Sequence, residues 1–184
     1  ETDTRRSPGY CNCSMNILAG RFKGQKIRTG AKASYRPTTS RVRKSIFDML
    51  GDLDGCSVLD LFAGSGILGF EAASRGAKSV TFVENSMRIN SLLKINGSFF
   101  KETDVNYVRM DALKFLKQSN CFDLILADPP YEYDQFDLLI DSCINQLNEN
   151  RFFILESSLQ TYSIPPGRVK EYGDTQLSFW KKEQ

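Results

Sequence analysis

The chain has 184 residues, of which 41% are hydrophobic and 25% charged, which fits one globular domain with small additions and excludes two large domains or wholesale disorder. No apolar run approaches the ~20 residues needed to cross a bilayer, and the absence of histidine excludes Ser-His and Cys-His nucleophilic pairs and His-ligated metal sites, so no metal is expected. The net charge of +2 hides a segregation, because residues 1–45 carry 11 Lys and Arg against 2 acidic residues, whereas residues 46–184 carry 13 against 20.

The N-terminal part of the chain is predicted to form a small basic unit. Residues 1–14 lack a regular pattern and a signal-peptide core, so we expect a leader or an appended remnant there, and a cytoplasmic protein without a membrane partner. Residues 15–54 predict a β-hairpin over Asn16–Thr29 and then, after a proline turn and an N-cap, a helix that ends at Gly51.

The hairpin and the start of the helix carry a dense set of cations. Residues 15–45 include no acidic residue, which is typical of an arm that binds a polyanion. The alternative is a basic surface that only aids solubility. The cations that we expect to contact phosphate groups are Arg21, Lys23, Lys26, Arg28, Arg36, Arg41 and Arg43.

Residues 55–184 alternate between predicted strands and helices, which indicates a doubly wound, Rossmann-like α/β sheet that is mostly parallel. The expected strands are Ser57–Phe62, Ser79–Glu84, Asn106–Met110, Phe122–Ala127 and Phe152–Glu156. The expected helices are Leu68–Arg75, Met87–Phe99, about Leu113–Leu116, and Phe136–Leu147. Arg168–Tyr172 and Leu177–Trp180 are close enough in the chain to end the sheet as an antiparallel hairpin.

A glycine-rich turn follows the first of these strands. Gly64, Gly66 and Gly69 satisfy the pattern G-x-G-x-x-G, in which glycines let the backbone approach a ligand closely. Asp60 near the end of the strand would repel the pyrophosphate of NAD, but it suits the ammonium and sulfonium groups of S-adenosylmethionine. We therefore expect S-adenosylmethionine to be the cofactor; the structural alternative is a glycine turn with an ordinary helix-capping aspartate. The same turn adds Phe62, Ala63 and Ser65 to the predicted cofactor site.

Two further acidic residues end the next two predicted strands. Glu84 is placed to accept both hydroxyls of a ribose. Asp111 is placed to accept the amino group of adenine or to cap the following helix, and the two roles can coexist. Their neighbours Asn85 and Ala112, together with Asp128, extend the predicted cofactor site.

The predicted catalytic residues are Asp128, Pro129, Pro130 and Tyr131, which follow the apolar strand Phe122–Ala127. The two prolines fix the backbone and remove two N–H donors. The Asp128 side chain and the proline carbonyls therefore present hydrogen-bond acceptors beside the ring of Tyr131. This arrangement suits an aromatic amine, which would donate to Asp128 and to the Pro129 carbonyl while Tyr131 stacks on the base. The alternative is a rigid turn with a surface tyrosine.

The segments Leu59-Asp60-Leu61-Phe62-Ala63-Gly64-Ser65-Gly66 and Asp128-Pro129-Pro130-Tyr131 resemble those of class I amino-methyltransferases of nucleic acid. More narrowly, the chain from about Met15 to Lys181 resembles the bacterial RsmD family. That resemblance is carried by segments such as Arg36-Pro37-Thr38, Arg41-Val42-Arg43, Leu68-Gly69-Phe70-Glu71-Ala72 and Glu171-Tyr172-Gly173. It implies transfer of a methyl group from S-adenosylmethionine to the exocyclic amine of a guanine in small-subunit ribosomal RNA.

The resemblance also implies that Arg36 and Thr38 lie at the mouth of the cofactor site, and that the basic arm serves the RNA. We expect the RNA to be part of an assembled or assembling ribonucleoprotein particle and the enzyme to be a monomer. Ser40 and Lys44 depart from the family pattern, which has acidic residues there. The segment between Glu156 and Arg168 is short, so a helix that is usual in class I methyltransferases is expected to be missing.

Three alternatives stay open on the sequence. A DNA adenine amino-methyltransferase would use the same amine pocket, although 184 residues leave little room for a recognition domain. An NAD-dependent oxidoreductase would use the glycine turn, but Asp60 and the lack of histidine argue against it. An inactive RNA-binding protein would be expected to lack part of the amine-pocket motif, which is complete here.

Overall fold

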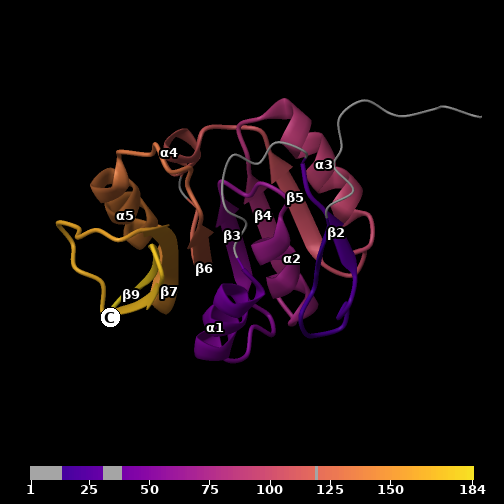
Figure 1. The fold of residues 1–184 in the computed structure, drawn as a ribbon, viewed down its shortest axis with the longest axis horizontal. Helices are drawn as coiled ribbons and strands as arrows, with labels where there is room; N and C mark the ends of the chain where they lie inside the picture. Colours follow the sequence, from indigo (N-terminus) through magenta and orange to yellow (C-terminus); the bar gives the residue numbers. More distant parts are fainter. Residues whose placement is uncertain (1–13, 31–38, 119) are drawn as a thin grey trace, which may run out of the picture.

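A seven-stranded sheet runs through the part of the chain that this computed structural model describes, which is residues 14–30, 39–118 and 120–184 (Figure 1). In spatial order its strands are β5 (Asp104–Val108), β4 (Ser79–Val83), β3 (Ser57–Leu61), β6 (Phe122–Ala127), β7 (Leu147–Ser158), β9 (Thr175–Lys181) and β8 (Arg168–Tyr172). The first five are parallel; β9 runs antiparallel to β7, and β8 runs antiparallel to β9. The predicted mixed sheet with a closing hairpin is confirmed.

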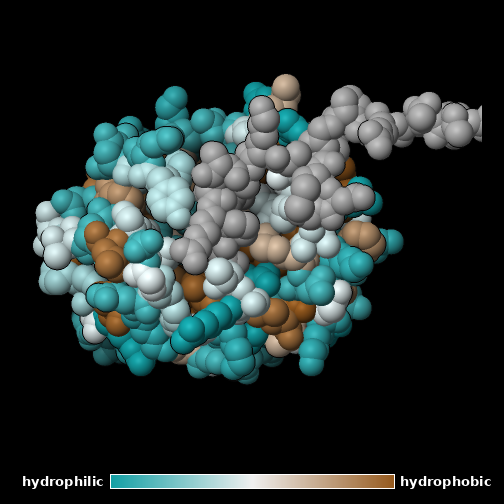
Figure 2. Space-filling model, in the orientation of Figure 1, coloured by the Kyte–Doolittle hydropathy of each residue, from teal (hydrophilic) through white to brown (hydrophobic). Residues whose placement is uncertain are grey.

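Helices cover both faces of the sheet. The inner strands β3 and β6 are therefore buried on both sides. One core joins the sheet to α1 (Ser40–Leu50), α2 (Ile67–Ser74) and α3 (Met87–Gly97). The other joins it to α4 (Ala112–Phe115) and α5 (Phe136–Asn145). None of these helices is long and apolar enough to cross a bilayer. Figure 2 shows hydrophobic residues scattered among hydrophilic ones on the face seen in Figure 1.

The predicted boundaries differ from the observed ones mainly around β7. The helix expected over Phe136–Leu147 ends at Asn145, and β7 begins at Leu147 rather than at Phe152. Leu147 pairs with Phe122 of β6, and the register then shifts before Phe152 pairs with Leu124. An irregular pairing of this kind leaves no alternation in the sequence, which explains why the start of the strand was misplaced.

The predicted N-terminal hairpin is confirmed as β1 (Ser14–Asn16) and β2 (Lys26–Arg28), although it is not a separate lobe. Ile17 and Ile27 are buried in the same core as α1 and α2. The predicted leader, residues 1–14, lies outside the described residues except for Ser14. The hairpin therefore has a fixed position on the sheet domain.

A buried carboxylate on α2 holds the hairpin in place. Glu71 is fully buried and accepts hydrogen bonds from the backbone N–H groups of Leu18 (2.7 Å) and Ala19 (3.0 Å). Its charge is balanced by Arg75, whose Nε lies 2.9 Å away. One buried helix side chain thus satisfies two backbone donors of the arm through charge-assisted hydrogen bonds.

Gly20 comes next in the chain and lies directly against the end of α2. With φ at +81°, a Cβ atom at Gly20 would lie 1.8 Å from the backbone oxygen of Ser74, whereas Gly24, with φ at +85°, has nothing within 4 Å of such an atom. The two glycines have nearly the same φ and different surroundings.

We predict that Gly20→Ala destabilises the protein more than Gly24→Ala. Both variants are expected to lose about 1 to 2 kcal/mol for the left-handed backbone, and Gly20→Ala a further ~1 to 3 kcal/mol because the hairpin must move away from α2. Urea unfolding followed by circular dichroism measures both changes. Equal losses would contradict the close contact.

Candidate active site

The sheet has a crevice where the strand order reverses, since β4 and β6 lie on opposite sides of β3. A cavity of about 430 Å³ occupies this place, within the volume range of small-molecule sites. We call it the switch-point cavity. It is lined by Phe62, Gly64, Val83, Glu84, Asn85, Ile89, Met110, Asp111, Ala112, Asp128, Pro130, Tyr133 and Gln135.

Two carboxylates on the wall of this cavity are held in fixed positions. Glu84 accepts hydrogen bonds from the backbone N–H groups of Gly64 (3.1 Å) and Ser86 (2.8 Å), one on each oxygen. Asp111 caps α4 by accepting the N–H of Lys114 at 3.0 Å, so the capping role weighed for it is confirmed. Each carboxylate oxygen has more than one acceptor direction, so both groups can also accept from a ligand.

Aromatic rings line another part of the switch-point cavity. Phe62 has a φ of 56°, which a non-glycine residue rarely adopts, and its ring meets that of Tyr133 edge to face with centroids 5.2 Å apart. Backbone strain of this kind is concentrated at functional sites. Burial raises the pKa of the Tyr133 hydroxyl, which is consistent with a mainly apolar environment.

Sequence reasoning missed five residues of this cavity: Val83, Ile89, Met110, Tyr133 and Gln135. Val83 directly precedes the predicted Glu84. Met110 and Tyr133 are near motifs that the sequence did identify, one directly before Asp111 and the other two residues after Tyr131. Proximity to these motifs could have indicated them, whereas the placement of Ile89 and Gln135 depends on how α3 and the segment before α5 pack.

Asp60 is close to the glycine turn but does not line the switch-point cavity. Its side chain is 2% exposed and accepts the backbone N–H of Gly69, in the first turn of α2, at 2.9 Å. This is the helix-capping arrangement that was weighed as the structural alternative. Burial raises the pKa of its carboxyl to about 8, although the hydrogen bond from Gly69 acts in the opposite direction.

The remaining predicted cofactor residues fall into three groups. Seven line the cavity: Phe62, Gly64, Glu84, Asn85, Asp111, Ala112 and Asp128. Ala63, Ser65 and Gly66 are buried in the turn behind it. Gly66 is required there, because with φ at +80° an added Cβ would lie 2.6 Å from side-chain atoms of both Leu93 and Phe70. Thr38 lies outside the described residues.

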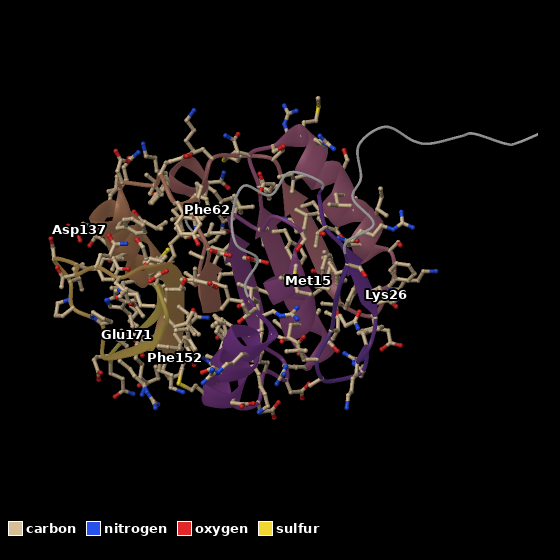
Figure 3. All side chains as sticks on the ribbon, viewed as in Figure 1. Met15, Lys26, Phe62, Asp137, Phe152 and Glu171 are labelled. Carbon is tan, nitrogen blue, oxygen red and sulfur yellow. The ribbon has the colours of Figure 1, made fainter. Side chains whose placement is uncertain are left out.

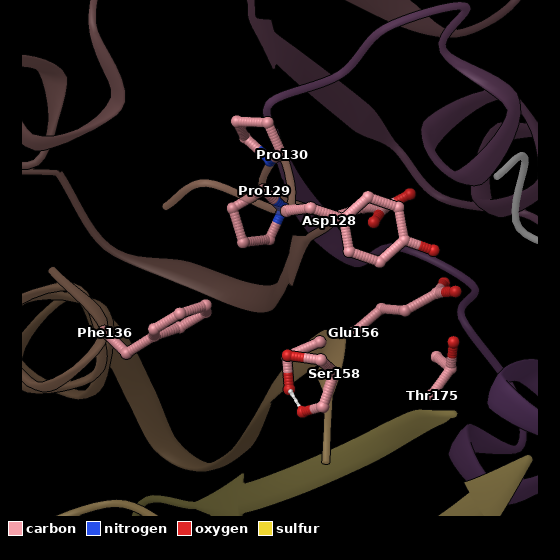
Figure 4. Close-up of a pocket in the computed structure, with 9 residues that line it drawn as sticks. Asp128, Pro129, Pro130, Phe136, Glu156, Ser158 and Thr175 are labelled. Carbon is pink, nitrogen blue, oxygen red and sulfur yellow. Dashed lines mark hydrogen bonds between the residues drawn. The ribbon is translucent and has the colours of Figure 1, made fainter. Parts of the chain in front are cut away.

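The four predicted catalytic residues lie together at a second, smaller cavity, which we call the amine pocket (Figure 4). Its other lining residues are Phe136, Glu156, Ser157, Ser158 and Thr175. Asp128 and Pro130 line both this pocket and the switch-point cavity. The amine pocket holds only about 20 Å³, roughly one water molecule, so a base can enter only if side chains move. Tyr131 is 59% exposed, so its side chain has room to do so.

The far edge of the amine pocket comes from the sheet itself. As predicted, no helix lies between β7 and β8. Instead, the end of β7 supplies Glu156, Ser157 and Ser158, and the start of β9 supplies Thr175. The Ser157 hydroxyl is 2.6 Å from the hydroxyl of Tyr162, which ties the connecting segment to this edge.

A groove of about 440 Å³ leads away from the amine pocket and shares Glu156 and Thr175 with it. The groove lies between the start of α1 and the turn from β8 to β9. Arg41 lines it, with the guanidinium carbon 5.9 Å from the centre of the Tyr172 ring. One of the predicted phosphate contacts is therefore beside the entrance to the amine pocket.

The other predicted phosphate contacts differ in accessibility. Lys23, Lys26 and Arg28 are exposed, and Arg21 is exposed but paired with Glu102. Arg36 lies outside the described residues.

The prediction for Arg43 is wrong. Its side chain is 3% exposed and donates to the carbonyl of Asn16 at 3.2 Å, so it holds the hairpin against α1 rather than facing a ligand. Burial lowers the pKa of this guanidinium, partly offset by the charge of Glu71.

Several known proteins are similar to this chain in sequence or in fold. The family model described as conserved hypothetical protein 95 matches residues 15–181. Ribosomal RNA small subunit methyltransferase D of Buchnera aphidicola (subsp. Acyrthosiphon pisum) is 35% identical over 160 residues, which cover 84% of this chain and 84% of that protein. The solved structure of the Escherichia coli protein yhhF is similar with a TM-score of 0.83 at 27% identity, covering 94% of this chain and 100% of that one. The fold also matches a Thermus thermophilus 16S rRNA methyltransferase, RsmC, in complex with AdoMet and guanosine, with a TM-score of 0.75 at 19% identity, over 96% of this chain and 52% of that one.

The burial of Asp60 predicts a pH-dependent stability. Because its folded pKa lies above the unfolded value of 3.8, the folded state retains a proton that the unfolded state loses, and the free energy of unfolding falls as pH rises from about 4 to about 8. Asp60→Asn keeps an oxygen for the Gly69 N–H and cannot ionise. We predict that its stability relative to the unsubstituted protein rises over this range, by at most about 1.4 kcal/mol per pH unit.

Urea unfolding at pH 5, 6, 7 and 8 measures this difference. The matched control is Asp104→Asn, which changes an exposed residue at the start of β5 and should show no such trend. A stability difference between Asp60→Asn and the unsubstituted protein that does not change with pH would contradict the buried, protonated carboxyl.

Proposed function

This chain belongs to the family of conserved hypothetical protein 95, the RsmD family, and on that basis we propose that it transfers a methyl group from S-adenosylmethionine to the exocyclic amine of a guanine in small-subunit ribosomal RNA. The observation that carries the proposal is that Asp128 and Pro130 line both cavities. A cofactor in the switch-point cavity and a base in the amine pocket would then meet at one aspartate.

The switch-point cavity fits the chemistry of S-adenosylmethionine. Glu84 would accept the ribose hydroxyls and Asp111 the adenine amine, with Phe62 and Tyr133 beside the purine ring. When bound, this cofactor supplies an electrophilic methyl group on a positively charged sulfur. The NAD alternative fits less well, because Glu84, Asp111 and Asp128 line the cavity and none of its described lining residues is a Lys or Arg that could balance a pyrophosphate.

The amine pocket would act mainly by positioning the nucleophile. Asp128 and the Pro129 carbonyl would accept the two hydrogens of the guanine amine and so aim its lone pair, while Tyr131 stacks on the base. The new nitrogen–carbon bond forms as the sulfur–carbon bond breaks, and the sulfur keeps the bonding electrons. The nitrogen then loses one proton to water, directly or by way of Asp128, whose negative charge stabilises the positive charge that develops on the amine.

We propose that residues 15–54 are the part that grips RNA and that residues 55–184 perform the transfer. Figure 3 shows Lys26 of the hairpin on one side of Phe62 and Glu171, which lines the groove, on the other, so the hairpin would contact a different part of the RNA from the groove. Arg41, on the groove beside Tyr172, would guide the RNA backbone nearer the reacting base. We propose a monomeric enzyme that acts on ribosomal RNA during particle assembly, which makes the cytoplasm its proposed location.

The proposal is tested by methyl transfer from radiolabelled S-adenosylmethionine to small ribosomal subunits from a strain that lacks the enzyme. Asp128→Ala should reduce the rate by at least ~100-fold, because the amine loses its orientation, and should leave calorimetric cofactor affinity within about tenfold, since Asp128 is one of several cavity residues.

The matched control for this test is Asp134→Ala, which removes an exposed carboxylate in the following loop that lines neither cavity. It should keep both activity and affinity. A rate within about threefold for Asp128→Ala would show that Asp128 does not position the nucleophile.

The basic arm predicts a steep dependence of RNA affinity on salt. Replacing the exposed Lys23, Lys26 and Arg28 with Gln should flatten the log–log slope by about 2 to 3, because each true phosphate contact contributes about 0.7 to 0.9. Cofactor affinity should not change. Binding of small-subunit RNA is measured between 50 and 200 mM salt, values chosen to span the range in which counterion release dominates.

The control removes three exposed lysines elsewhere, Lys114, Lys117 and Lys181. It changes the net charge by the same amount. If both triple variants keep the original slope, the arm is only a solubilising surface; if both flatten it equally, net charge rather than the arm controls binding.

A further inference from the structure

We propose that Glu156 selects guanine over adenine, by accepting the N1–H of the base whose 2-amino group is held by Asp128. This inference rests on the proposed function and adds a specificity-determining residue to it. The sequence motifs did not indicate Glu156 as part of the site.

The strand register brings the two carboxylates level with each other. β6 and β7 are parallel, with Leu126 opposite Ile154 and Ala127 opposite Leu155. The next residues along the two chains are Asp128 and Glu156. Neighbouring strands lie about 4.8 Å apart, so the two side chains start from adjacent positions at the same edge of the sheet.

Alternation along the strands puts both side chains on the same face. Leu126 and Ile154 belong to the core under α1 and α2, whereas Ala127 and Leu155 belong to the opposite core. Asp128 and Glu156 therefore return to the first face. Figure 4 shows both carboxylates extending toward the same space, with Thr175 beside Glu156.

Glu156 lies at the boundary between the amine pocket and the groove. It is 8% exposed, lines both spaces, and sits on a strand that is paired on both sides up to this edge, with Leu177 of β9 directly opposite. Moving a carboxylate out of water costs free energy, and a carboxylate on the wall of a pocket is a strong acceptor for a ligand N–H. A base that enters from the groove must pass this group.

The two purines differ at the atom that such a carboxylate would meet. Guanine carries adjacent donors, N1–H and the 2-amino group, so Asp128 and Glu156 can each accept one of them. Adenine places a bare N1 lone pair beside its 6-amino group. With the adenine amine on Asp128, that lone pair would oppose the charge of Glu156, and a buried mismatch of this kind gives strong discrimination. Asp128 alone offers no such distinction.

The test compares two bases at the methylated position, once that position has been mapped. Ligated RNA carries either guanine or 2-aminopurine there; the latter keeps the 2-amino group but has a bare N1 acceptor. The unsubstituted enzyme should prefer guanine by at least ~100-fold in kcat/KM. Glu156→Gln presents an amide N–H to N1, so this preference should fall at least ~10-fold, with transfer to 2-aminopurine RNA rising above that of the unsubstituted enzyme.

Glu149→Gln is the matched control, because it makes the same change at an exposed position near the other end of β7 and should keep the full preference. Calorimetric cofactor affinity verifies that each variant is folded. The inference is overturned if Glu156→Gln keeps the preference for guanine, or if the unsubstituted enzyme methylates both RNAs equally well. The second measurement needs no variant. Absence of transfer to any guanine would instead contradict the proposed function itself.

Discussion

The site depends on one topological constraint, the reversal of winding between β3 and β6. The chain leaves the ends of these neighbouring strands toward opposite sides of the sheet, so no connection closes the space above them. Phe62 and the carboxylates of the switch-point cavity surround this gap: Phe62 follows β3, Asp128 follows β6, Glu84 follows β4 and Asp111 follows the outer strand β5. The position of this gap is set by the parallel pairing of the strands and does not depend on which side chains line it.

Periodicity predicted the order of strands and helices, and with it this edge of the sheet, because apolar runs and glycine stops are local signals. The direction of a side chain at the edge is not local. The glycine pattern correctly indicated a tight turn after β3, yet Asp60 faces α2 and not the cavity, since its place in the alternation puts it under the helix. Glu156 was missed for a related reason: its relation to Asp128 depends on the register of two strands whose pairing the sequence does not state.

Arg43 shows a second way in which prediction from the sequence failed. Its charge placed it among the predicted RNA contacts, although its spacing from Ile46 and Phe47 is that of one buried helix face. The helical pattern and the charge made opposite predictions, and the pattern was the better guide because burial of Val42, Ile46 and Phe47 fixes the rotation of α1. For the cations of the hairpin, charge and pattern do not make opposite predictions, because these residues are not part of an amphipathic helix.

The attachment of the hairpin to α2 also has a consequence for biosynthesis. Leu18 and Ala19 leave the ribosome early, but the carboxylate that receives their N–H groups lies 53 and 52 residues later in the chain. Long-range contacts of this kind form late, after local elements have folded. The arm therefore acquires its final position only when α2 has docked on the sheet, and α2 begins at the glycine turn of the switch-point cavity. A nascent or damaged chain in which that turn has not formed would therefore also lack a correctly placed basic arm. The ability to bind RNA thus depends on correct folding of the methyl-transfer site.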